Sequence, residues 1–196
     1  MPAPTVLIVP GLRDHVDAHW QTLLALDLRE QQRKVWTVPA MGRIDLDCAA
    51  RVAAIEEAAQ VIAGPLVLVA HSGGCVMVAH WAQQTTRPVL GALLATPPDF
   101  EQPLPDGYPT IDALRANGWL PVPRKPLPFP SVVAASRDDP LARFERIGQL
   151  ARDWNSRFVD LGFVGHLNPA SGYGRWSRAE AFINEISTPA DASVRG

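Results

Sequence analysis

The apolar residues of this chain fall into two alternating patterns. Six short, mostly apolar runs are bounded by proline, glycine or polar residues, which is typical of strands buried in a sheet. These runs lie at 5–9, 35–38, 66–70, 89–95, 132–135 and 157–161. The stretches between them place apolar residues three or four positions apart, as on one face of a helix. They predict helices at 19–32, 47–63, 75–84, 141–154 and 177–186.

Strands that alternate with helices predict a parallel sheet covered on both faces. We therefore expect an α/β fold, namely a three-layer α/β/α sandwich around a mostly parallel six-stranded sheet. One domain is expected over residues 1–188, followed by a disordered tail at 189–196. In such a sheet, ligands bind at the carboxyl ends of the strands, where the strand order reverses.

The segment from Pro97 to Pro130 interrupts this alternation. It holds ten of the nineteen prolines and shows little periodicity beyond one short helix expected at 111–115. A connection this long in a compact domain is usually functional or mobile.

Composition narrows the class of protein. The chain has 196 residues and a net charge of -2, so there is no electrostatic case for binding nucleic acid or an anionic membrane. No run approaches the ~18 apolar residues that span a bilayer. The start, Met1-Pro2-Ala3-Pro4, leads into the first strand without a basic region, so we expect no signal peptide and a cytoplasmic location.

Cysteine and histidine usage argues against a disulfide scaffold or a metal centre. The two cysteines, Cys48 and Cys75, lie in expected helices and are interpreted as small buried hydrophobes. No cysteine or histidine spacing indicates a zinc site. We therefore expect no metal and no cofactor.

The clearest chemical signal is a serine at a sharp strand-to-helix turn. The strand at 66–70 ends in Ala70-His71-Ser72-Gly73-Gly74, after which a helix begins. This resembles the G-x-S-x-G turn that holds a nucleophilic serine clear of a sheet, with alanine in place of the first glycine. The alternative is that Ser72 only caps the helix, since serine is a favoured N-cap residue.

Two further stretches follow other strands at their carboxyl ends. Ser136-Arg137-Asp138-Asp139-Pro140 follows the fifth strand, and Gly165-His166 lies in the loop after the sixth. Serine, an aspartate and a histidine thus appear in chain order, each after a different strand. A serine needs an imidazole to take its proton, and the imidazole needs a carboxylate to fix its tautomer. The loop after the first strand, Pro10-Gly11-Leu12, can add an amide to an oxyanion hole.

These residues resemble those of the α/β-hydrolase superfamily, and within it the small serine hydrolases of the retinoblastoma-binding protein 9 and YdeN family. The resemblance spans roughly residues 5–187 and is most specific at Gly165-His166-Leu167-Asn168-Pro169-Ala170-Ser171-Gly172. It implies Ser72 as nucleophile, His166 as base and Asp139 as acid, with Asp138 as the alternative acid. It also implies that Leu12 and Gly73 donate the oxyanion-hole amides. Residues 97–130 occupy the position of the lid found in many hydrolases.

The resulting hypothesis is a serine hydrolase that cleaves a small carboxylic ester through an acyl-serine, with an amide or peptide as alternative substrates. Its expected partner is a small acyl substrate. Trp119, Leu120 and Phe129 either line an acyl pocket or seal the proline-rich segment against the core. The rival from another class is a non-catalytic protein-binding module that keeps the hydrolase fold. A nucleotide-binding protein is disfavoured, because Pro10-Gly11-Leu12-Arg13-Asp14 lacks G-x-G-x-x-G.

Overall fold

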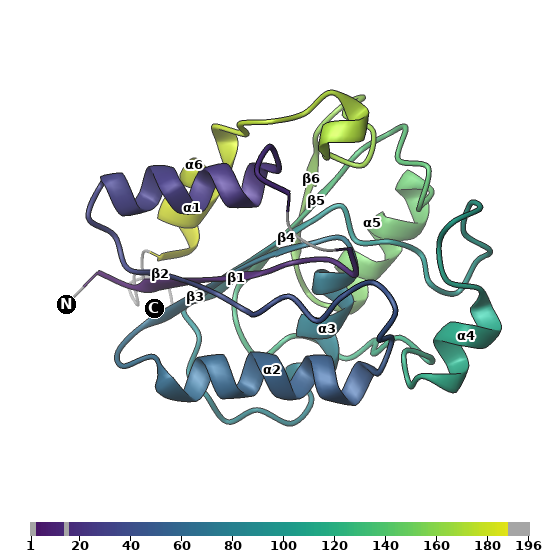
Figure 1. The fold of residues 1–196 in the computed structure, drawn as a ribbon, viewed down its shortest axis with the longest axis horizontal. Helices are drawn as coiled ribbons and strands as arrows, with labels where there is room; N and C mark the ends of the chain where they lie inside the picture. Colours follow the sequence, from purple (N-terminus) through teal and green to yellow (C-terminus); the bar gives the residue numbers. More distant parts are fainter. Residues whose placement is uncertain (1–2, 14–15, 188–196) are drawn as a thin grey trace, which may run out of the picture.

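A computed structural model of the chain describes residues 3–13 and 16–187, and the expected tail at 189–196 lies outside them. Strands and helices alternate along these residues (Figure 1). The strands are β1 (Thr5–Val9), β2 (Val35–Thr37), β3 (Leu66–His71), β4 (Gly91–Ala95), β5 (Ser131–Ala135) and β6 (Arg157–Asp160). The helices are α1 (Trp20–Glu30), α2 (Cys48–Val61), α3 (Gly73–Trp81), α4 (Ile111–Ala116), α5 (Phe144–Asp153), the 3-10 turn η1 (Pro169–Ser171) and α6 (Arg178–Ser187).

The six strands form one sheet in the order β2-β1-β3-β4-β5-β6, and every neighbouring pair is parallel. The predicted α/β fold is therefore confirmed, with a sheet that is wholly parallel. The strand order reverses between β1 and β3, which pair from Thr5↔Leu66 to Val9↔Ala70. The loops that leave these two strands thus start side by side at one edge of the sheet, where open α/β sheets bind ligands.

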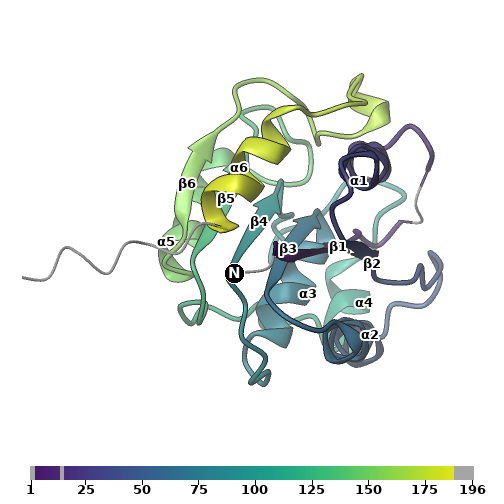
Figure 2. The same ribbon diagram turned by 90° about the vertical axis from the view of Figure 1, so that its left-hand side faces the viewer.

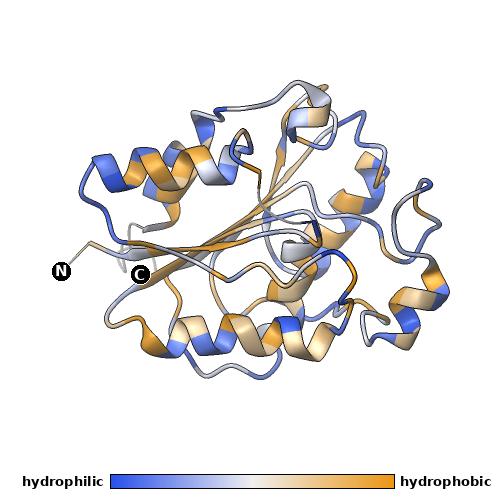
Figure 3. Cartoon of the chain, in the orientation of Figure 1, coloured by the Kyte–Doolittle hydropathy of each residue, from blue (hydrophilic) through white to orange (hydrophobic). Residues whose placement is uncertain are grey.

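Two helical layers cover the sheet. Helices α1 and α6 lie on one face, and α2, α3 and α5 lie on the other, as the two views show (Figures 1 and 2). Successive strand residues point to opposite faces, so β1 sends Val6 and Ile8 into the first layer and Leu7 and Val9 into the second. The strands are largely hydrophobic, whereas the covering helices carry both kinds of residue (Figure 3). This explains why the strand runs were continuous and the helices were periodic.

The proline-rich segment packs largely as part of the core. Trp119 and Phe129 are buried in the cluster beneath α2, α3 and α5, and Leu120 packs against it. The Trp119 indole donates to the carbonyl of Leu46 at 2.7 Å, which ties the segment to the loop before α2. The structure therefore supports the alternative in which these residues seal the segment against the core.

Helix α5 begins later than the apolar pattern suggested. The helix was expected from Leu141, but it starts at Phe144. The carboxylate of Asp139 accepts from the Leu141 amide at 2.9 Å, which holds these residues in a turn after β5. Among the described residues, no helix is long and apolar enough to cross a membrane.

Candidate active site

Ser72 sits at the junction of β3 and α3 in a backbone conformation that side chains seldom adopt. Its φ is 56° and its ψ is -132°, and its amide extends the ladder by donating to the carbonyl of Ala95 at 3.0 Å. Such strain is tolerated where the surroundings hold it in place. The structure shows no side-chain cap from Ser72 to the helix, so the hydroxyl is free for another partner.

Three glycines allow the loop after β1 to press against this turn. A Cβ on Gly11 would lie 3.0 Å from the Cβ of Ser72. A Cβ on Gly74 would lie 2.5 Å from the carbonyl oxygen of Pro10, a backbone atom that cannot move aside cheaply. A Cβ on Gly73 would meet the Leu12 side chain at 2.8 Å. The glycines are therefore needed for close approach, and they make Leu12 and Gly73 neighbours beside Ser72.

The structure brings Ser72, His166 and Asp139 into one hydrogen-bonded chain. His166 Nε2 lies 2.8 Å from Ser72 Oγ. On the other side of the ring, Nδ1 lies 3.0 and 2.9 Å from the two carboxylate oxygens of Asp139. The side chains of His166 and Asp139 are only 5% and 3% exposed, so water competes little for these bonds. With Nδ1 protonated toward the carboxylate, Nε2 is free to accept the serine proton.

The side chain of Asp138 does not contact the imidazole but supports the loop that follows β6 and carries His166, here called the histidine loop. Its Oδ1 accepts from Ser136 Oγ at 2.7 Å and from the Gly165 amide at 2.8 Å. These two bonds favour the carboxylate and lower the pKa of Asp138 below its ordinary value, with the Ser136 hydroxyl the larger cause. These neighbouring residues of the turn after β5 thus serve different partners, and only Asp139 reaches the imidazole.

The backbone of His166 is clamped on both sides. Its amide donates to Ser171 Oγ at 3.0 Å, and its carbonyl oxygen lies 2.9 Å from His71 Nε2. The residues on either side, Gly165 and Leu167, have positive φ values of 55° and 47°. Leu167 is fully buried, which fixes an otherwise unfavourable conformation by packing. The clamp therefore sets the direction of the imidazole.

His71 is a buried neutral donor in this clamp. A carbonyl oxygen can only accept, so Nε2 of His71 carries the proton in this bond. Burial lowers the pKa of His71 well below its ordinary value, and the nearby His166 and His19 rings lower it further. The His71 ring centroid lies 4.9 Å from that of His166 and 4.8 Å from that of His19. Keeping His71 uncharged avoids a second cation beside the imidazole.

A pocket of about 380 Å³ opens beside Ser72 and His166. Its apolar wall comes from the start of the proline-rich segment and the turn before α5, through Phe100, Leu104 and Leu141. Tyr108 also lines it. The volume is in the range of small-molecule sites. The residues of the proline-rich segment that line the pocket thus lie at 98–109. They precede Trp119, Leu120 and Phe129, which do not line it.

The two cysteines and the possible metal ligands were also compared with the site. Cys75 lies just after the serine in α3, but its thiol is buried, donates to the carbonyl of Ala95 at 3.3 Å and has a pKa raised by that burial. The pKa of the buried Cys48 is likewise raised, to about 11. Within residues 3–13 and 16–187, no group of three or more His, Cys, Asp or Glu residues is placed to hold a metal ion.

The family model described as serine hydrolase matches residues 6–185, which is nearly the whole chain. The chain belongs to this serine hydrolase family. A search of curated proteins gave no significant match. Among solved structures, one described as a YdeN-like hydrolase from Pectobacterium atrosepticum is 28% identical, with a TM-score of 0.77, and the match covers 94% of this chain and 91% of that one.

Two more distant structures share the fold of this serine hydrolase. The ydeN gene product of Bacillus subtilis is 16% identical with a TM-score of 0.70, and the match covers 93% of this chain and 98% of that one. Est1E of Butyrivibrio proteoclasticus, solved with ferulic acid bound, is 14% identical with a TM-score of 0.66, covering 94% and 90%. The resemblance to YdeN-like α/β hydrolases is thereby confirmed.

Several residues around the serine were not assigned a role from sequence. His71 stands directly before Ser72, and Ser171 lies within the specific stretch after His166, so position gave a signal for both. The pocket residues Phe100, Leu104 and Tyr108 had none, because they lie in a segment without periodicity.

Proposed function

We propose that this family member hydrolyses small carboxylic esters, with Ser72 as nucleophile, His166 as general base and acid, and Asp139 as the carboxylate that orients the imidazole. The observation that carries the proposal is the continuous chain from Asp139 through His166 to Ser72, with every link at 3.0 Å or less. A serine whose hydroxyl points at a buried, carboxylate-bound imidazole can be deprotonated as it attacks.

The first half-reaction transfers the acyl group to the serine. Ser72 Oγ forms a bond to the ester carbonyl carbon while its proton moves to His166 Nε2. The carbonyl electron pair moves to oxygen and gives a tetrahedral oxyanion. When this collapses, the bond to the alcohol breaks and His166 returns the proton to the leaving alkoxide. An acyl-serine and a free alcohol remain.

In the second half-reaction, water is the nucleophile and Ser72 is the leaving group. His166 takes a proton from water, the hydroxide oxygen bonds to the acyl carbon, and the second tetrahedral intermediate expels Ser72, which regains its proton from the imidazolium. The products are a carboxylic acid and the free enzyme. These proton transfers need only the chain's own side chains.

The amides of Leu12 and Gly73 are proposed to hold the oxyanion. Gly73 is the first residue of α3, so its amide has no partner within the helix and faces the turn. The position of a Cβ on Gly73 is 3.5 Å from the Leu12 amide nitrogen, which supports convergence of the two donors. Two such amides stabilise the charge that develops only after attack.

A small ester is favoured over a polymeric substrate by the size and apolar wall of the pocket, formed by Phe100, Leu104 and Leu141. The structurally similar Est1E binds ferulic acid, which is a carboxylic acid of the kind that an ester hydrolase releases.

Hydrolysis of 4-nitrophenyl butyrate by the purified chain tests this function. We expect the wild type to release nitrophenolate. Ser72→Ala should lower kcat by at least two orders of magnitude, which is less than the full effect of removing a member of a well-studied triad. Ser177→Ala, at an exposed serine that does not line the pocket, is the matched control. Turnover by Ser72→Ala within tenfold of the wild type would contradict Ser72 as the nucleophile. No turnover by a folded wild type would favour the binding-module alternative.

A further inference from the structure

The pocket beside Ser72 carries positive charge that ester hydrolysis alone does not require. The chain has a net charge of -2, yet the described pocket lining contains two arginines, Arg13 and Arg43, and neither an aspartate nor a glutamate. The two arginines come from different loops, after β1 and after β2. An inference from this feature rests on the proposed function, because it concerns the substrate of the same site.

Among the described residues, the side chain of Arg13 is held by a carbonyl and an aromatic ring and by no carboxylate. Its Nη2 donates to the carbonyl of Gly107 at 3.1 Å, and its guanidinium carbon lies 4.1 Å from the centre of the Tyr108 ring. One of five N–H donors is used in this way, and stacking on the aromatic ring reduces the freedom of the side chain. Arg13 directly follows Leu12, and both residues line the same pocket as Ser72.

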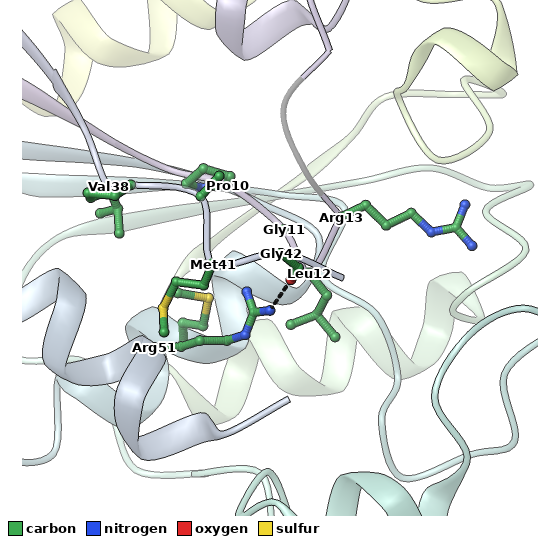
Figure 4. Close-up of a pocket in the computed structure, with 11 residues that line it drawn as sticks. Pro10, Gly11, Leu12, Arg13, Val38, Met41, Gly42 and Arg51 are labelled. Atoms are coloured by element: carbon green, nitrogen blue, oxygen red, sulfur yellow. Dashed lines mark hydrogen bonds between the residues drawn. The ribbon is translucent and has the colours of Figure 1, made fainter. Parts of the chain in front are cut away.

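Arg43 lies in the loop after β2, and the buried Arg51 of α2 holds this loop in place. Arg51 is only 3% exposed, and its Nη2 donates to the carbonyl of Gly42 at 2.7 Å (Figure 4). Its Nε donates to the carbonyl of Asp45 at 3.1 Å. These carbonyls flank Arg43 on both sides. Among the described residues, the Arg43 side chain has no hydrogen bond or ion pair. The loop is thus fixed while its exposed guanidinium keeps its donors.

We propose that the substrate is an ester carrying an anionic group, such as a half-ester of a dicarboxylic acid, whose charge is bound by Arg13 and Arg43 while its carbonyl lies at Ser72. Guanidinium groups pair with carboxylates through two parallel hydrogen bonds, which gives orientation as well as attraction. Between the charge and the ester, the chain of the substrate contacts the apolar wall of Phe100 and Leu104. A neutral ester gains only the apolar contacts.

A structural role for Arg13 is the competing explanation, because its bond to Gly107 links the loop after β1 to the proline-rich segment. A hydrogen bond that only links these two segments would affect every substrate alike. A charge-binding residue affects only the anionic one, so the ratio of the two rates separates the explanations.

The test compares mono-4-nitrophenyl adipate with its neutral methyl ester. We expect kcat/KM to be about tenfold higher for the anionic ester, the combined size of two partly exposed charge pairs, and the preference to shrink in about 1 M NaCl. Arg13→Gln and Arg43→Gln should each lower the anionic-to-neutral ratio about threefold, and the double variant should bring it near one. Arg29→Gln, an exposed arginine of α1 that does not line the pocket, should leave the ratio unchanged.

Equal rates for the two esters in the wild type, or equal losses for both in the arginine variants, would overturn the inference and leave the proposed hydrolase intact. If both esters turn over too slowly to compare, adipate and neutral adipamide are compared as competitors of a neutral fluorophosphonate at Ser72. Stronger protection by adipate, lost in the double variant, supports the inference, and equal protection overturns it. A chain whose serine reacts with neither ester nor fluorophosphonate would fail the proposed function itself, and the inference with it.

Discussion

Replacing Asp139 by asparagine changes one atom of the proposed triad, and the structure predicts a large effect. Both carboxylate oxygens of Asp139 lie within 3.0 Å of His166 Nδ1, and Oδ1 also accepts from the Leu141 amide. Whichever way the new amide is turned, its NH2 group lies about 3 Å from Nδ1, where it favours an unprotonated nitrogen. The ring proton then moves to Nε2, which can no longer accept the serine proton.

The expected loss follows from this change of tautomer. In a well-studied triad the same substitution costs on the order of 10⁴ in kcat. We expect Asp139→Asn to lose at least about 10² in kcat, which corresponds to about 2.7 kcal/mol of activation free energy. The measurement is steady-state hydrolysis of 4-nitrophenyl butyrate, with near-ultraviolet circular dichroism to show that each variant is folded.

Asp138→Asn is the matched control, because it makes the same substitution one residue earlier. The asparagine carbonyl oxygen can still accept from Ser136 Oγ and from the Gly165 amide, so the histidine loop keeps its support. We expect kcat to fall by less than about tenfold. A larger loss for Asp138→Asn than for Asp139→Asn would refute the assignment of the acid, and equal small losses would mean that neither aspartate orients His166.

Two further predictions concern the scaffold of the site. His71 must gain a proton on unfolding below about pH 6.5, because its folded pKa is depressed, so the wild type should lose up to about 1.4 kcal/mol of unfolding free energy per pH unit there. Urea unfolding at two pH values should show a smaller loss for His71→Gln. Gly74→Ala should lower the unfolding free energy by about 1–3 kcal/mol, since its Cβ meets the Pro10 carbonyl, whereas Gly148→Ala in α5 has room at 3.6 Å and should not destabilise. Equal thermal shifts for the two alanine variants would contradict this packing argument.

The sheet was predictable from sequence because a strand buried on both faces has a distinctive composition. The run at 5–9 is fully buried in the structure, and its apolar residues fill both layers. The order of Ser72, Asp139 and His166 along the chain also carried their placement, because parallel strands end at one edge. What no pattern encoded was the direction of each side chain after its strand, which decides between Asp138 and Asp139.

The pocket was the least predictable part, because its wall depends on how an irregular segment folds back. Trp119 and Phe129 are the largest apolar residues of the segment's second half, and they went to the core, where burial is worth most. The residues at 98–109 line the pocket because they leave β4 at the carboxyl edge of the sheet. Hydrophobicity alone does not distinguish a residue that lines a pocket from one that fills a core.

The mass of the intact protein after reaction with a fluorophosphonate tests the central claim most directly, since this reagent phosphonylates an activated serine. The account predicts the addition of one phosphonyl group to the wild type, located on the peptide that contains Ser72, and none to Ser72→Ala. It also predicts that His166→Ala reacts at least about 10² times more slowly, because the serine has lost its base. Labelling of Ser72→Ala at the wild-type rate, or an unreactive wild type that is folded, would contradict it.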